Sequence, residues 1–348
     1  MFGLPKEIVG NVEKKASYFS KVYKNCLKMK DENVIIISDY GQGGNKLATM
    51  MGCGYYLAAK EKGWNTTLLF QDVKKGFMQA DRHVVEALQR LEKKSIIILA
   101  LSNKLGQIGK EKSFRGFCQE QGHRFISSTG LGDVGMNYFD LFLEAMSVNY
   151  SRMQKQGLAI KKLWDKASTI TVKTDAGTDV TFDVEGKEAI ANTGEYGKEG
   201  SGGNMPCGEV YIPPKGFEGV NGTIVIDGSL KLDQGALLVD EPLTLIIKQG
   251  RVMKMEGKYA SLLEKTLRAY QDRAKYPHRV RYIGELGIGI NPSAVVIGSM
   301  IMDEKVFGTG HIAIGSNYWF GGDIKTIFHG DQVFKNPQFY VDGKKMDI

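Results

Sequence analysis

The pattern of apolar and polar residues in the first half of the chain predicts alternating strands and helices. Short apolar runs bounded by turn residues are typical of buried strands, and apolar residues spaced three and four apart are typical of helices. We expect strands at 34–38, 65–70, 95–101 and 124–127, and helices at 6–30, 46–62, 79–93 and 114–121. Such alternation produces a sheet covered by helices on both faces. The first half is therefore predicted to be an α/β domain with a mostly parallel sheet.

The pattern changes after Ser168, where alternation of apolar and polar residues becomes common. Residues 169–173 and 180–184 flank Asp175-Ala176-Gly177, which is typical of a β-hairpin. Further strands are expected at 223–227, 243–248 and 251–255, and helices at 138–165 and 259–274. The helical stretch at 138–165 is expected to link the halves. We therefore predict an α/β domain over 1–165 and an α+β domain over 166–348.

Composition and charge exclude several classes of protein. Hydrophobic residues make up 42% of the chain and charged residues 24%, as in an ordinary globular protein. No apolar run reaches the roughly 18 residues of a spanning helix, and the N-terminus lacks the apolar region of a signal peptide. The net charge of +7 is spread thinly, unlike the basic stripe of a nucleic-acid-binding protein. We expect a cytoplasmic protein that binds neither nucleic acid nor membrane.

The first predicted strand is followed by a glycine-rich turn, Gly41-Gln42-Gly43-Gly44. A dinucleotide-binding fingerprint requires a third glycine further on, and Lys46 stands at that position. We therefore interpret these glycines as a tight turn. The four cysteines include no C-x-x-C pair, so we expect free thiols rather than a zinc or redox motif.

Histidines and carboxylates gather in the second half of the chain. His311, His329 and Asp331 lie near the C-terminus, and Glu209 and Glu285 precede them in glycine-flanked segments. Imidazole and carboxylate together suit zinc and other first-row divalent metals. This set exceeds what one tetrahedral site requires. It suits two metals that share a bridging carboxylate, an arrangement used for metal-assisted hydrolysis.

Several motifs resemble the aminopeptidase T-like metallo-aminopeptidases, also called the thermophilic metalloprotease family. The resemblance covers residues 165–342 strongly and the first half only as a fold pattern. The motifs are GTD in the hairpin (177–179), NMPCGEV (204–210), IGELGIG (283–289), DE (303–304) followed by HIAIG (311–315), and HGD (329–331). Their order along the chain makes the resemblance specific.

This resemblance implies a dinuclear metal-dependent aminopeptidase that releases N-terminal residues from short peptides and is usually a homodimer. The cofactors would be two divalent metal ions, zinc, cobalt or manganese, in the second, catalytic domain. A metal-bound hydroxide would attack the peptide carbonyl, and Tyr318 would act in the site by hydrogen bonding to the ligand or the oxyanion. The metal ligands would be Glu209, Glu285, His311, His329 and Asp331, with Glu285 as the catalytic bridge.

Two alternatives remain open. A sister branch of this fold resembles the iron-dependent dihydroxypyridine ring-cleaving dioxygenases, which keep the terminal H-x-D, lack the first acid and carry histidine at the second. Here both positions are Glu, which favours the aminopeptidase. A mononuclear iron(II) centre of His311, His329 and Asp331 is nevertheless possible, and it would leave Glu209 and Glu285 surplus. A degenerate, metal-binding member without peptidase activity is the other alternative.

Two residues beside the motifs have roles that the sequence leaves open. Glu304 either orients His311 or is an extra metal ligand, or it belongs to a turn with Asp303. Cys207 is either an auxiliary metal ligand, an oxidation-sensitive thiol or a small packing residue beside Glu209.

Overall fold

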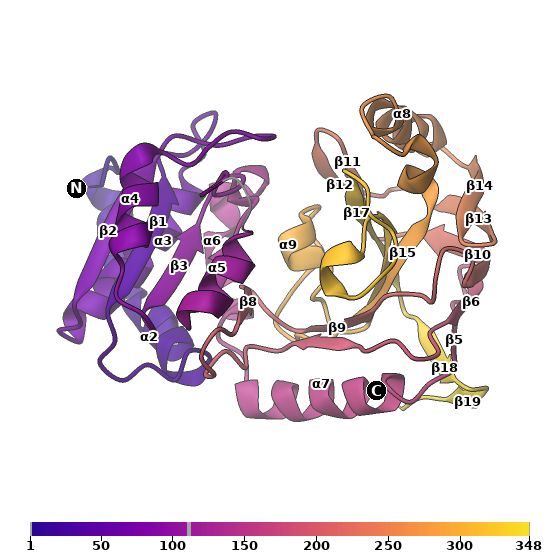
Figure 1. Ribbon diagram of the computed structural model, residues 1–348, viewed down its shortest axis with the longest axis horizontal. Helices are drawn as coiled ribbons and strands as arrows, with labels where there is room; N and C mark the ends of the chain where they lie inside the picture. Colours follow the sequence, from indigo (N-terminus) through magenta and orange to yellow (C-terminus); the bar gives the residue numbers. More distant parts are fainter. Residues whose placement is uncertain (1, 110–112, 348) are drawn as a thin grey trace. The chain divides into compact units, whose positions relative to one another are not determined.

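The chain forms two compact units, each of which contains two separate segments of the sequence. A computed structural model describes residues 2–109 and 113–347. The first unit is Met1–Tyr150 with Gly194–Cys207, and the second is Ser151–Thr193 with Gly208–Ile348. Figure 1 shows the elements of both units coloured along the sequence. The domain division after residue 165 stays a prediction.

The first unit contains a five-stranded sheet in the order β2-β1-β3-β4-β8. Every neighbouring pair of strands is parallel, as the strand–helix alternation predicts. The last strand, β8, belongs to the segment Gly194–Cys207, with which the chain returns to the first unit. The strands are β1 (Val34–Asp39), β2 (Thr66–Gln71), β3 (Ile96–Ala100), β4 (Arg124–Ser128) and β8 (Gly202–Asn204).

Helices cover this sheet and account for its continuous apolar strands. Both β1 and β3 are buried along their whole length, because helices on both faces leave no polar side of the sheet. Val84 and Leu88 of α4 pack against Ile35, Ile97 and further apolar residues of the strands. The helices are α1 (Lys6–Lys14), α2 (Ala16–Asn25), α3 (Leu47–Glu61), α4 (Arg82–Arg90), α5 (Phe114–Gln121) and α6 (Phe139–Ala145).

In the first half, one expected helix is divided in two, whereas the expected glycine turn is present. The amphipathic stretch 6–30 forms two helices rather than one, because α1 ends at Lys14 and α2 begins at Ala16. The glycine-rich segment forms a tight turn, in which Gln42 and Asn45 exchange both backbone hydrogen bonds. Gly41 and Gly44 have φ angles of +85° and +84°, which favour glycine.

The second unit contains two antiparallel sheets among the described residues. The first has the order β14-β13-β10-β6-β5-β18-β19, and it includes the predicted hairpin of β5 and β6. Its strands are β5 (Thr169–Lys173), β6 (Asp179–Asp183), β10 (Val220–Ile226), β13 (Leu243–Lys248), β14 (Arg251–Glu256), β18 (Gln338–Val341) and β19 (Lys344–Lys345).

The second antiparallel sheet, which we call the site sheet, has the order β12-β11-β17-β16-β15-β9-β7. Its strands are β7 (Ile190–Asn192), β9 (Glu209–Ile212), β11 (Ser229–Leu232), β12 (Gly235–Leu238), β15 (Ile283–Gly289), β16 (Thr309–Gly315) and β17 (His329–Lys335). Three helices complete the unit: α7 (Tyr150–Trp164, whose first residue belongs to the first unit), α8 (Ala260–Gln271) and α9 (Met300–Asp303).

The chain thus has a mixed α/β fold with one parallel sheet and antiparallel sheets, in agreement with the predicted class. The helical stretch 138–165 is divided into α6 and α7. Within residues 2–109 and 113–347, no helix is long and apolar enough to cross a membrane.

Candidate metal centre

Three neighbouring strands of the site sheet bring the motif residues onto one face. Ala313 on β16 is paired with Glu285 on β15 and with Asp331 on β17. Side chains of directly paired residues lie on the same face, and so do residues two apart on one strand. His311, two residues before Ala313, and His329, two residues before Asp331, therefore share this face. Strand alternation alone brings these four side chains together.

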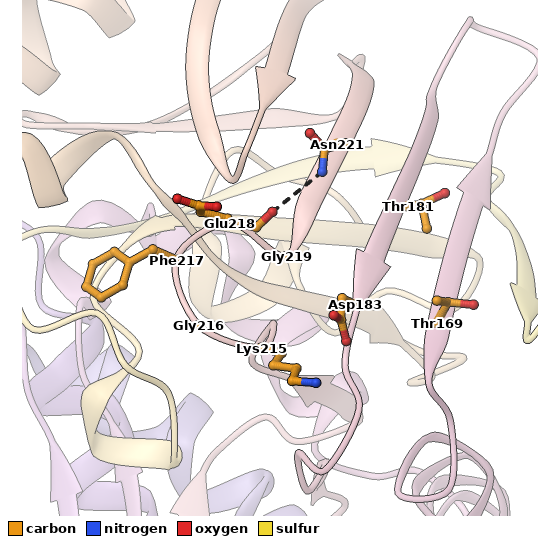
Figure 2. Close-up of a pocket in the computed structure, with 9 residues that line it drawn as sticks. All are labelled: Thr169, Thr181, Asp183, Lys215, Gly216, Phe217, Glu218, Gly219 and Asn221. Atoms are coloured by element: carbon orange, nitrogen blue, oxygen red, sulfur yellow. Dashed lines mark hydrogen bonds between the residues drawn. The ribbon is translucent and has the colours of Figure 1, made fainter.

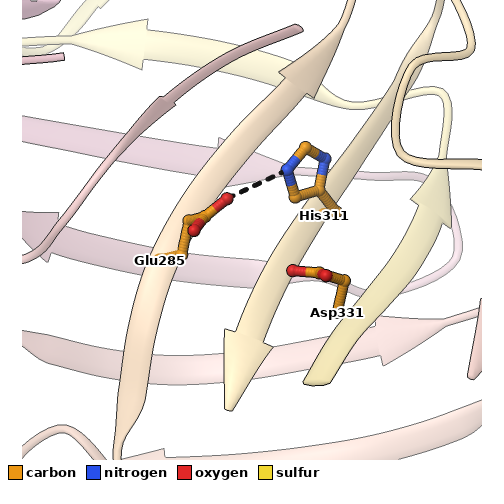
Figure 3. Close-up of side chains that lie close together, drawn as sticks. All are labelled: Glu285, His311 and Asp331. Carbon is orange, nitrogen blue, oxygen red and sulfur yellow. Dashed lines mark ion pairs between the residues drawn. The ribbon is translucent and has the colours of Figure 1, made fainter. Parts of the chain in front are cut away.

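Glu285, His311 and Asp331 form a group whose geometry suits a metal ion. One ligand atom from each lies within 4.8 Å of the others. Figure 3 shows the three side chains converging from β15, β16 and β17. Glu285 Oε1 lies 3.3 Å from His311 Nε2. All three residues are buried, and His311 is completely inaccessible to solvent.

His329 presents a second imidazole to the same cluster. Its Nε2 lies 3.4 Å from Asp331 Oδ1 and 3.8 Å from Glu285 Oε2. Its Nδ1 lies 2.7 Å from the carbonyl oxygen of Ser316, which can only accept, so Nδ1 carries the proton of that hydrogen bond. Metal-binding histidines commonly use such a bond to direct the other nitrogen at the ion. The ring of Trp319 packs edge-on against the His329 ring.

Several buried polar atoms of the cluster lack a hydrogen-bond partner. Neither ring nitrogen of His311 has one of suitable geometry, and Asp331 Oδ1 has none. Burying a polar group without a partner costs on the order of 1–3 kcal/mol in proteins. A metal ion bound by these atoms would offset that cost, so the donor set fits a divalent cation.

The charges of the cluster shift the pKa values of its members. Burial raises the pKa of Glu285. Burial alone would lower the pKa of His329, but the charges of Asp331 and Glu285 outweigh it and raise that pKa to about 10. Burial would raise the pKa of Asp331, but the His329 charge outweighs it and lowers that pKa. In the metal-free protein a proton on His329 therefore partly balances the carboxylates.

Metal binding is expected to release this proton. Because the pKa of His329 is raised to about 10, a metal ion must displace a proton from the imidazole at neutral pH. The apparent affinity for cobalt(II) should rise by about tenfold per pH unit from pH 6 to 8. Titration calorimetry in buffers of different ionisation enthalpy should count about one released proton. An affinity that does not change with pH would remove His329 from the ligand set.

The same raised pKa makes the metal-free protein less stable as the pH rises, whereas metal binding becomes stronger. The proton on His329 stabilises the folded state fully below the unfolded histidine pKa of about 6.5. That contribution is lost as the pH rises through the folded value of about 10.

Glu209 lies beside the cluster, but its carboxylate already has partners. Lys305 Nζ lies 2.7 Å from Glu209 Oε1, and Asn192 donates a hydrogen bond of 2.9 Å to the same oxygen. Glu209 Oε2 lies 3.7 Å from His311 Nε2. The expectation that Glu209 binds a metal stays a prediction. The structure shows a cation, the lysine ammonium, next to this acid.

Lys305 is a buried residue that sequence reasoning missed, and it pairs with the half-buried Glu304. Lys305 is completely buried and its Nζ forms ion pairs with both Glu304 and Glu209. Burial would lower the pKa of Lys305, but these two carboxylates outweigh it and raise that pKa. Burial raises the pKa of Glu304 well above its usual value. Glu304 lies in the turn that follows α9, where it is half-buried and pairs with Lys305.

Gly287 is a second residue that sequence reasoning missed. It pairs with His311 across β15 and β16, and a Cβ atom on it would lie 2.0 Å from His311 Nε2. The missing side chain therefore leaves room for the imidazole ring. The sequence did contain a signal for this role, because Gly287 and Gly289 stand at alternate positions of one strand. Glycine inside a strand often marks a place where another group approaches the backbone closely.

Gly287→Ala is expected to displace the His311 ring and weaken metal binding. Overpacking of this kind costs about 1–3 kcal/mol. If that cost falls on the metal-bound arrangement, cobalt(II) affinity should drop by about 5- to 150-fold, measured by calorimetry. Gly10→Ala is the matched control, because an added Cβ there meets nothing within 4 Å. Equal affinities in both variants would show that the space at Gly287 has no role.

Tyr318 lies in a 3-10 turn, Tyr318–Phe320, and is exposed. Lys325 Nζ lies 4.9 Å from the centre of its ring. Its proposed catalytic role stays a prediction. Trp319, the next residue, is the one that contacts His329. Cys207 is buried, forms no disulfide within the described residues, and belongs to the first unit.

A surface hollow on the second unit lies apart from the candidate metal ligands. Figure 2 shows that it is formed by the first antiparallel sheet and the loop before β10. None of the cluster residues contributes to its lining, so we do not include it in the metal centre. The residues that line it are Thr169, Thr181, Asp183, Lys215, Gly216, Phe217, Glu218, Gly219 and Asn221.

A comparison with protein families identifies the chain's relatives. The family described as NicX: 2,5-dihydroxypyridine 5,6-dioxygenase matches residues 142–347, more than half of the chain. The chain belongs to the NicX family. The NicX match includes all four cluster residues, together with Glu209 and Lys305. No curated protein matches this NicX-family chain in sequence.

Two solved structures share the fold of this NicX-family chain. One is the 2,5-dihydroxypyridine dioxygenase from Pseudomonas putida KT2440, with a TM-score of 0.74, 17% identity, and coverage of 96% of this chain and 95% of that one. The other is wild-type AmpT from Thermus thermophilus, with a TM-score of 0.63, 14% identity, and coverage of 97% of both chains. At these identities the likeness concerns the fold alone.

These findings correct the functional expectation from the sequence. The resemblance to aminopeptidase T is real at the level of fold. The NicX family match and the dioxygenase neighbour, however, show that the prediction of a hydrolytic aminopeptidase was wrong. The dioxygenase alternative agrees better with both.

Proposed function

We propose that this protein is an iron(II)-dependent dioxygenase that cleaves a hydroxylated, pyridine-like aromatic ring. The cluster of two imidazoles and two carboxylates, buried except for the half-buried His329 and containing donor atoms without hydrogen-bond partners, supports this proposal most directly. It lies within the segment that matches the NicX family. Two histidines and a carboxylate with open positions are the usual donors for iron(II) in oxygenases.

The iron would be held by His311, His329 and Asp331, with Glu285 beside them as a further oxygen donor. Bound there, it would supply the activation of dioxygen and of the hydroxylated ring that ring cleavage requires. Ser316 keeps the Nδ1 proton on His329, so that Nε2 faces the cluster. The complete burial of His311 keeps water away from that donor.

Trp319 offers a surface for an aromatic substrate. Trp319 is 59% exposed, although its ring contacts the His329 ring in a T-shaped arrangement. Aromatic rings stack on such faces with a gain of about 0.5–1.5 kcal/mol beyond simple burial. A planar substrate on this ring would lie next to a metal-binding imidazole, which agrees with an aromatic rather than a peptide substrate.

The test is oxygen consumption by protein loaded with iron(II) under anaerobic conditions. We expect 2,5-dihydroxypyridine, or another dihydroxylated ring in a panel that includes 2,5-dihydroxybenzoate, to lose its ring absorbance with one equivalent of dioxygen. His329→Ala should lower the rate by at least about 100-fold, as expected for loss of a metal ligand. Iron-loaded protein that consumes no oxygen with any ring of the panel would refute the proposal.

A further inference from the structure

We propose that Lys305 is a built-in cation that takes the place of a second metal ion, so that the centre accepts a single divalent ion. The inference rests on the metal centre of the proposed function but not on ring cleavage. It names a residue that sets the metal stoichiometry of this site.

The burial of Lys305 is the first observation. Lys305 is 0% exposed and is among the largest fully buried side chains of the described residues. Burial of an ammonium group costs several kcal/mol unless charged partners compensate. Here two carboxylates do so, because Glu209 and Glu304 both pair with Nζ. The ammonium and its two acids form one ion-paired group.

The position of this group is the second observation. Glu209 pairs with Lys305 through Oε1 at 2.7 Å, and its Oε2 lies 3.7 Å from His311 Nε2. His311 Nε2 in turn lies 3.3 Å from Glu285 Oε1. Lys305 is therefore separated from the metal cluster by a single carboxylate. Glu209 is the carboxylate that lies between Lys305 and the cluster.

Competition for the same oxygen is the third step. Metals in dinuclear centres lie about 3.5–4 Å apart and share carboxylate oxygens. A second divalent ion on Glu209 would have to displace the ammonium or lie against it. Like charges at such distances in a buried environment repel strongly. With Lys305 in place, the oxygen Oε1 is satisfied by Nζ and by Asn192.

The number of metal ions bound tests the inference, because loss of a purely structural ion pair would not change that number. Wild-type protein saturated with cobalt(II) should bind one equivalent, measured by elemental analysis after desalting and by calorimetry. Lys305→Met removes the charge with little change in length and should bind two equivalents. The double variant Lys305→Met/Glu209→Gln should return to one, and Lys305→Arg should keep one. Lys74→Met is the matched control, because Lys74 is also a buried lysine, paired with Asp81.

The outcomes separate this inference from the proposed function. Two equivalents in the wild type, or one in a folded Lys305→Met variant, overturn the inference and leave the metal centre intact. No bound metal in the wild type overturns the metal centre itself. Circular dichroism checks folding. If Lys305→Met does not fold, the Glu209→Gln variant tests the inference instead. A cobalt(II) affinity within about threefold of the wild type would support Glu209 as the partner of Lys305 and not a metal ligand. A loss of more than about tenfold would make Glu209 a ligand and overturn the inference.

Discussion

Glu285→Gln is expected to abolish stable metal binding while leaving the fold intact. The carboxylate of Glu285 lies 3.3 Å from His311 Nε2 and 3.8 Å from His329 Nε2, so it contacts both imidazoles of the cluster. Glutamine keeps the shape and removes the negative charge. Loss of an outer partner of a ligand typically costs 10–100-fold in affinity, and loss of a charged donor should cost at least about 100-fold.

Metal content after desalting and calorimetric titration would measure this effect. Oxygen-dependent turnover should fall with it, and the circular dichroism spectrum should not change. Glu256→Gln, at the exposed end of β14, serves as the control and should bind metal normally. Normal metal content together with normal turnover in Glu285→Gln would exclude Glu285 from the centre.

Phe334→Ala is expected to destabilise the site sheet by about 3–5 kcal/mol, the usual cost of removing a buried phenylalanine ring. Phe334 is completely buried on β17, the strand that carries His329 and Asp331. Gly310 on β16 makes room for the ring, since a Cβ there would lie 2.5 Å from it. For a unit of this size each kcal/mol lowers the melting temperature by roughly 2–4 °C.

Differential scanning calorimetry would detect this change as a lower transition temperature of metal-free protein. Phe334→Leu should lose clearly less, because it keeps most of the buried apolar volume. Well below its transition the alanine variant should still bind one metal, since Phe334 alternates with the site-facing residues of β17. Equal transition temperatures for the wild type and the alanine variant would contradict the packing described here.

Hydrophobic pattern predicted the first sheet well and the site sheet poorly. The continuous apolar runs of β1 and β3 are visible because both faces of that sheet are covered by helices. In contrast, β15 contains three glycines and a buried acid, so its sequence lacks a strand-like alternation. Its importance could be predicted only from its resemblance to a family motif.

The cluster itself could be predicted, whereas its chemistry could not. Glu285, His311, His329 and Asp331 were named together, and they do lie on one face of adjacent strands. Glu209 suggested a second metal because a sequence does not show what an acid is paired with. Its partner, Lys305, follows Asp303 and Glu304 in a segment where nothing in the residue types indicates an inward direction.

The returning segment 194–207 has a practical consequence for dissecting the molecule. It supplies β8, the neighbour of β4. The backbone N–H of Phe125 on β4 donates to the Ser201 carbonyl, and the Ser127 carbonyl accepts from the N–H of Met205. A fragment that ends at residue 150 would lack this strand and leave β4 as a bare edge, which invites pairing with other chains. A fragment that contains the parallel sheet without β8 is therefore expected to aggregate when expressed alone. A proteolytic cut within 194–207 would damage the first unit even though the site lies in the second.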